Sequence, residues 1–96
     1  MDDLSNALRG EPKPVQFAGV ACTLTRPTVM DAIVLADMVA KNPGEDVKTS
    51  AFLVARHLHR NGQPVFATVE DVLAADWNLI RTLIEAVNQL YSEGGN

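Results

Sequence analysis

The chain has 96 residues, of which 47% are hydrophobic and 21% are charged, and its formal net charge at pH 7 is −4. This length predicts a single domain, and the hydrophobic content is that of a globular protein rather than of a disordered one. Acidic residues outnumber basic ones, and the sequence contains no run of basic residues that could bind phosphates. Binding to nucleic acid is therefore disfavoured.

The first part of the chain predicts a flexible arm and then a β-hairpin. Residues 1–14 contain glycine and proline at spacings that prevent a continuous helix, so we expect an arm there. Two segments, 14–18 and 19–25, alternate apolar and polar residues, and the phase of this alternation changes at Ala18-Gly19. A two-residue turn explains the change, since glycine tolerates the positive φ of a tight hairpin.

Two helices are predicted after the hairpin. The first covers residues 28–41, because Thr28 is a suitable N-cap and a proline at position 43 cannot continue the helix. The second begins at residue 45 or 46 and reaches about residue 60. Asn61-Gly62 follows it and favours a helix stop.

Two further helices complete the predicted domain. A short one covers about residues 69–75 behind a threonine cap, and a clearly amphipathic one, capped by Asp76, covers residues 77–92. We therefore predict a mainly α, α+β fold, in which a small N-terminal β-hairpin packs on a bundle of about four helices. This domain covers residues 15–92, and residues 93–96 are expected to form a flexible tail.

The residue pattern predicts no catalytic site, metal site or cofactor. His57 and His59 are two residues apart on a predicted helix, whereas zinc-binding pairs on helices are three or four apart, so both are expected to be solvated. Cys22 falls among the inward residues of a strand, which suits a small buried apolar side chain. Acidic pairs such as Glu45-Asp46 stand at predicted helix starts, where acids are favoured. We expect a chain that is not an enzyme, although a site assembled from distant residues stays open.

The same sequence predicts a cytoplasmic protein without a membrane partner. No apolar stretch approaches the roughly 20 residues that cross a bilayer. The start, Met1-Asp2-Asp3, has the wrong charge for a secretory signal. The single cysteine, Cys22, cannot form an internal disulfide, which fits a reducing compartment.

The first predicted helix is apolar on two faces. One face holds Val29, Ala32, Ile33, Ala36, Val39 and Ala40, and the other holds Met30, Val34 and Met38. Such a helix is either sandwiched at the centre of the fold, between the second and fourth helices, or covered by a partner. In the second helix, Phe52 and Leu53 project beside the core stripe. We hypothesise that an interface with a protein, or with a second copy of this chain, uses Met30, Val34, Met38, Phe52 and Leu53.

Three stretches within residues 15–92 together resemble the tail assembly chaperones of tailed bacteriophages. The first, Leu24–Ala32, contains an Arg-Pro-Thr step followed by an acid. The second, Ala55–Phe66, leads from a helix end into Asn-Gly-Gln-Pro-Val-Phe, with Asn61 in place of the acid usual in that family. The third, Thr68–Asn88, combines a short acidic helix with a final amphipathic helix.

The resemblance implies a non-enzymatic assembly factor in the host cytoplasm that is absent from the mature virion. Its implied partner is the long, helical tape measure protein, with a further contact to the major tail protein while the tail tube assembles. Three alternatives stay open: another small phage or bacterial interaction protein, such as an inhibitor or adaptor; a small enzyme or metal-binding protein; and a helix-turn-helix regulator. The last would present only Arg81 as a cation on the final helix.

Overall fold

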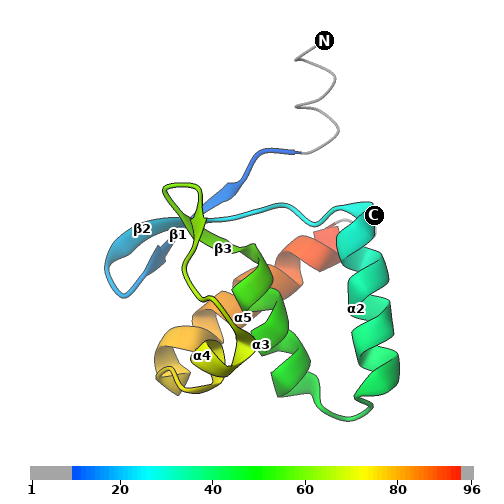
Figure 1. The fold of residues 1–96 in the computed structure, drawn as a ribbon. Helices are drawn as coiled ribbons and strands as arrows, with labels where there is room; N and C mark the ends of the chain where they lie inside the picture. The colour runs from blue at the N-terminus through cyan, green and yellow to red at the C-terminus, as the bar shows by residue number, and fades with distance from the viewer. Residues whose placement is uncertain (1–9, 94–96) are drawn as a thin grey trace.

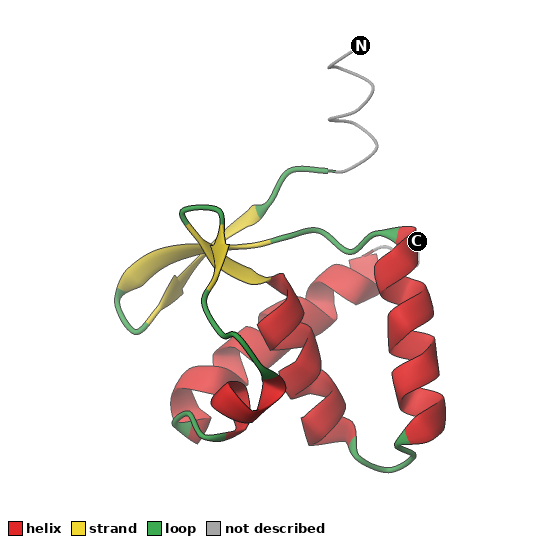
Figure 2. Cartoon of the chain, in the orientation of Figure 1, coloured by secondary structure: helices red, strands yellow, loops and turns green. Residues whose placement is uncertain are grey.

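The computed structural model describes residues 10–93, in which a small antiparallel sheet lies at one end of a group of helices (Figures 1 and 2). The strands are β1 (Lys13–Phe17), β2 (Val20–Leu24), β3 (Leu58–Arg60) and β4 (Gln63–Pro64), in the order β1-β2-β3-β4. The helices are α2 (Val29–Lys41), α3 (Asp46–His57), α4 (Val69–Leu73) and α5 (Trp77–Glu93). This arrangement confirms the predicted α+β class. Most of the predicted arm, and the last three residues of the predicted tail, lie outside the described residues.

The N-terminal hairpin is confirmed. Phe17 pairs with Val20 across a two-residue turn, and β1 and β2 pair in register back to Lys13. Both turn residues have positive φ, 52° at Ala18 and 77° at Gly19. A turn of this kind follows the natural twist of the two strands, which explains why the apolar alternation changes phase there.

The second predicted helix ends earlier than expected, and the prediction that it reaches residue 60 is wrong. The chain leaves α3 after His57 and enters β3, which pairs with β2 through Leu58 and Leu24. Asn61 and Gly62 have φ values of 54° and 77°, so they form the turn of a second hairpin between β3 and β4. Asn-Gly is both a helix stop and a strong hairpin signal, and here the hairpin forms.

The predicted caps locate the starts of three helices. Thr28 and Asp31 form a capping box on α2: the Thr28 N–H donates to Asp31 Oδ2 at 2.8 Å, and the Asp31 N–H donates to Thr28 Oγ1 at 3.3 Å. Thr68 Oγ1 accepts the Asp71 N–H at 3.2 Å in the first turn of α4. Asp76 Oδ2 accepts a backbone N–H at 3.3 Å in the first turn of α5. These bonds satisfy donors that the first turn of a helix leaves unpaired.

The core forms between the sheet and the helices α3, α4 and α5. Its buried apolar residues are Cys22, Leu24, Ala51, Leu53, Val54, Leu58, Val72, Ile80, Leu83, Val87 and Leu90. Cys22 is buried, as predicted for a small apolar residue on the inward side of a strand. None of these core residues comes from α2.

Helix α2 lies at the edge of the molecule, so a central position between its neighbours is excluded (Figure 1). Its only buried residue is Asp31, and Leu35 is its only hydrophobic residue that packs against the core. The physical reason is that α3 is already covered by α4, α5 and the sheet, which leaves α2 one side of α3 to contact. The apolar residues of α2 therefore have few partners among the described residues.

The turn between β3 and β4 supplies a first test of the fold. We expect Gly62→Ala to lower the free energy of unfolding by about 1–2 kcal/mol, because a side chain at φ 77° is strained even though the space beside Gly62 is open. Urea unfolding measures this. The control Asn61→Gly keeps the turn geometry and should change stability by no more than about 0.5 kcal/mol. Equal losses from both substitutions would contradict the turn assignment.

Candidate functional site

The most exposed large apolar side chains of α2 gather on one surface. Val29 is 80% exposed, Met30 60%, Ile33 58% and Val39 51%. We call this surface the outer face of α2, and its members are Val29, Met30, Ala32, Ile33, Ala36, Val39 and Ala40, all of them exposed. The exposed charges on this helix are Asp37 and Lys41, which pair with each other at 3.0 Å. A contiguous apolar surface of this kind is typical of a site that a partner covers.

The structure distributes the predicted interface residues differently from the hypothesis. Met30 lies on the outer face, whereas Val34 and Met38 are half-buried. Phe52 is also half-buried and packs against the core. Leu53 is 3% exposed and belongs to the core, so it is not available to a partner.

The burial of Asp31 shows which side of α2 faces the rest of the protein. A helix turns by about 100° per residue, so an inward Asp31 also turns Val34, Leu35 and Met38 inward. The same rotation turns Val29, Ile33 and Ala36 outward. The sequence separates the two apolar faces except at Met30, but the partner of Asp31 decides which face is exposed to solvent.

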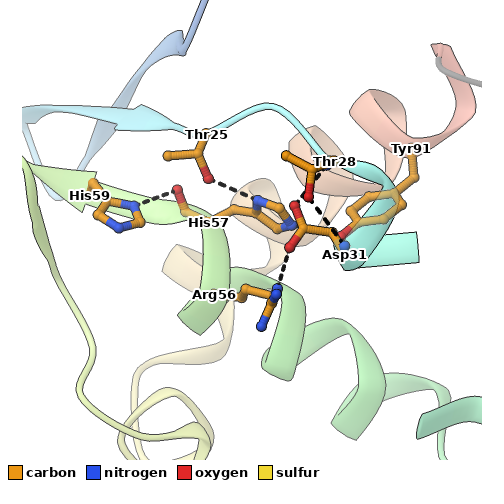
Figure 3. A network of polar contacts seen from close by, with 7 residues as sticks. All are labelled: Thr25, Thr28, Asp31, Arg56, His57, His59 and Tyr91. Atoms are coloured by element: carbon orange, nitrogen blue, oxygen red, sulfur yellow. Dashed lines mark hydrogen bonds and ion pairs between the residues drawn. The ribbon is translucent and has the colours of Figure 1, made fainter. Parts of the chain in front are cut away.

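That partner is Arg56 of α3 (Figure 3). Arg56 Nε donates to Asp31 Oδ1 at 2.5 Å, and the other carboxylate oxygen accepts the Thr28 N–H. The Asp31 side chain is 11% exposed and that of Arg56 34%. Both carboxylate oxygens are therefore satisfied, and the ion pair fixes the first turn of α2 to α3.

His57, the next residue, is buried at 1% exposure, so the prediction of a solvated histidine is wrong for it. His57 is the last residue of α3 and lies one turn after the buried residues Leu53 and Val54, and its ring lies between Thr25 and Tyr91 (Figure 3). His57 Nδ1 lies 2.9 Å from Thr25 Oγ1, and Nε2 lies 2.6 Å from the Tyr91 hydroxyl. His59 is half-buried, and its Nδ1 donates to the His57 carbonyl oxygen at 3.0 Å. We call Thr25, Thr28, Asp31, Arg56, His57 and Tyr91 the polar network.

Protonation in the polar network follows from burial and from hydrogen bonding. Burial lowers the pKa of His57 below 6.5, against the attraction of the Asp31 carboxylate. Burial raises the pKa of Tyr91 to about 12, and Asp31 adds to this rise. Burial also acts to raise the pKa of Asp31, but the hydrogen bonds from the Thr28 backbone and from Arg56 outweigh it and hold this pKa below 3.8. At neutral pH the carboxylate is ionised, while the imidazole and the phenol are neutral.

A neutral, enclosed imidazole with both ring nitrogens occupied positions its neighbours and offers no free nitrogen to a substrate. Within residues 10–93, no three His, Cys, Asp or Glu side chains come together as a metal site would require. Within the polar network, the ion pair between Asp31 and Arg56 anchors α2, and the outer face of that helix is turned away from this anchor.

A pocket of about 480 Å³ joins the polar network to the outer face. Residues 26–28 and the α2 residues Val29 and Ala32 form one side, and Leu90 and Tyr91 of α5 form the other. Because Tyr91 belongs to the network and Val29 to the outer face, an apolar partner lying on α2 would also reach the end of α5.

Comparisons with models of protein families, with curated proteins and with solved structures find no match to this chain. None of the helices in residues 10–93 has the length and apolar character needed to cross a bilayer. The functional assignment therefore depends on the surfaces and motifs of the chain itself.

The ion pair between Asp31 and Arg56 can be tested by neutralising its carboxylate. We expect Asp31→Asn to lower the free energy of unfolding at pH 7 by about 1–3 kcal/mol, because Arg56 loses a partly buried partner and the cap of α2 weakens. The pKa of Asp31 lies below 3.8 in the folded protein, so its contribution is complete above that pH and is lost as the pH falls through the lowered pKa.

Urea unfolding of both proteins at several pH values measures this difference. The matched control is Asp37→Asn, which breaks an ion pair whose side chains are 61% and 72% exposed and should cost no more than about 0.5 kcal/mol. Equal effects of the two substitutions at pH 7 would show that Asp31 does not anchor α2.

His57 predicts a second pH dependence in a higher range. Because its pKa is lowered on folding, the unfolded chain binds the proton more readily. The free energy of unfolding should therefore fall as the pH drops below 6.5 and through the lowered pKa. Thermal unfolding should show this decline in the wild-type protein and in His59→Gln, and a clearly smaller one in His57→Gln. The same pH profile for all three proteins would rule out His57 as the titrating group.

Proposed function

We propose that this chain is a non-enzymatic tail assembly chaperone of a tailed bacteriophage, which binds the tape measure protein through the outer face of α2. The observation that carries the proposal is this exposed apolar surface, on a helix whose only buried residue is Asp31. The motif resemblance over residues 15–92 supplies the identity of the partner. The chain would act in the host cytoplasm and be absent from the mature virion.

The shape and chemistry of the outer face suit a helical partner. A helix with an exposed apolar face can cover the apolar stripe of another helix, with contacts spaced by three and four residues. The outer face also carries the small residues Ala32, Ala36 and Ala40, which recur at every fourth position along the helix, so a partner helix can approach closely there. A long helical partner would have its apolar stripe covered until tail tube subunits replace the chaperone.

The polar network supports the proposal because it keeps the outer face available. If Asp31 did not face Arg56, the apolar side of α2 could rotate towards the rest of the protein and be buried there. The ion pair and the capping box keep Asp31 facing inward, so the apolar outer face stays exposed. The major tail protein and a second copy of the chain are further partners that an apolar surface of this kind could accept.

We expect a soluble complex when the chain is co-expressed with the tape measure protein from the same genome. Ile33→Asp should weaken this binding about tenfold or more, since it places a charge at the centre of the outer face. Co-purification and titration by calorimetry measure the effect. Gln89→Asp, which adds the same charge at an exposed position of α5, is the control and should bind as the wild type does.

Thermal unfolding of Ile33→Asp should match that of the wild type, because residue 33 is 58% exposed. A well-folded wild-type protein that neither binds the tape measure protein nor keeps it soluble would refute the chaperone assignment. Binding of Ile33→Asp at wild-type strength would instead remove the outer face of α2 from the interface. Capture of a different phage or bacterial protein would favour the inhibitor or adaptor alternative.

A further inference from the structure

A second apolar surface lies where the helices α3, α4 and α5 meet. Val47 of α3 is 57% exposed, Leu73 of α4 50% and Trp77 of α5 53%. These side chains surround an apolar pocket of about 120 Å³, which also reaches Ile80 and Ile84 of α5. We call it the α4 pocket.

The α4 pocket is separate from the outer face of α2. All the residues that line it come from α3, from α5 and from α4 with the loop that follows it, and none comes from α2. Helix α3 contacts both α2 and α4, and Figure 1 shows those two helices on opposite sides of it. A partner segment in this pocket would therefore leave the outer face of α2 free.

The size of the pocket suits one large apolar side chain. An apolar cavity of about 150 Å³ in another protein holds a benzene ring, so a pocket of about 120 Å³ can take a leucine, methionine or phenylalanine side chain. Its lining side chains are aliphatic except for Trp77, which disfavours a polar occupant that would lose its hydrogen bonds to water.

Charged residues close in sequence to the lining residues have a negative excess. The exposed charged residues within two positions of a lining residue are the carboxylates Glu45, Asp46, Glu70, Asp71, Asp76 and Glu85 and the cations Lys48 and Arg81. Glu70 lies one helical turn before Leu73, and Asp46 and Asp76 directly precede Val47 and Trp77. Among the described residues, none of these eight side chains forms an ion pair. Apart from Asp76 Oδ2, which accepts a backbone N–H as the cap of α5, the carboxylate oxygens are thus available to cations on a partner.

We propose that the α4 pocket binds one large apolar side chain of an amphipathic helix that carries lysine or arginine beside that side chain. The pocket supplies the apolar contact, and the surrounding carboxylates select the basic helix. This inference goes beyond the chaperone assignment and does not depend on what binds α2. With a site on each side of α3, one chain can hold two partner segments, and the first contact raises the effective concentration of the second.

Trp77 makes the test direct, because it is the only tryptophan in the chain and it lines the pocket. The probe is a synthetic peptide of about 20 residues, long enough to form a helix, with leucines along one face and lysines beside them. Titration into the wild-type protein should shift the Trp77 emission to shorter wavelength in a saturable way. A peptide with glutamate in place of each lysine should bind about tenfold more weakly or worse, and added salt should weaken binding of the lysine peptide.

Leu73→Ser removes a wall of the pocket while keeping Trp77 as the reporter, and it should weaken binding of the lysine peptide about tenfold or more. If this variant fails to fold by circular dichroism, Val47→Ser at a 57% exposed position replaces it. Ile33→Asp on α2 is the control and should bind the peptide as the wild type does, which separates this inference from the chaperone assignment. An unchanged Trp77 emission, equal binding of the glutamate peptide, or wild-type binding by the folded pocket variant would overturn the proposal.

Discussion

The ion pair between Asp31 and Arg56 is the constraint on which the presentation of α2 depends. The capping box fixes where the helix starts, and the guanidinium fixes which side of it turns inward. Because every other side chain follows at about 100° per residue, this one contact orients the whole helix. Its inward side has little apolar contact with the core, whereas its outer face carries Val29 and Ile33. An electrostatic contact thus decides the direction in which an apolar surface points.

The rest of the domain folds around a core to which α2 contributes no buried apolar residue. The sheet, α3, α4 and α5 enclose that core, and His57 stands at its edge, where α3 becomes β3. The carbonyl oxygen of His57 accepts the Thr25 N–H at 2.9 Å, while its ring contacts Thr25 and Tyr91. The polar network therefore joins the end of β2, the end of α3 and the last turns of α5 at the place where α2 begins.

Local signals predicted much of this fold, and long-range contacts account for what they missed. Thr28, Thr68 and Asp76 identified three helix starts, because a cap acts within a few residues of itself. Asn61-Gly62 stops a helix and also turns a hairpin, and the pairing of Leu58 with Leu24 across the sheet decided between the two. The burial of His57 and the orientation of α2 likewise depend on partners 25 or more residues away in the chain: Arg56 lies 25 residues from Asp31, and Tyr91 lies 34 from His57. Periodicity separated the two faces of α2 except at Met30, which lies on the outer face, and it did not indicate which face is exposed.

The small part that α2 plays in the core has an evolutionary consequence. Substitutions at Val29, Ile33, Ala36 or Val39 should change the stability of the fold little, because these side chains are exposed and none belongs to the core or packs against it. Substitutions at Asp31 or Arg56 would disturb the orientation of the whole helix. Selection can therefore change the exposed residues to suit a new partner. In the remainder of the chain, only substitutions that keep the domain folded can accumulate. Homologues that have exchanged partners should differ most on this one helix and agree on the ion pair that holds it.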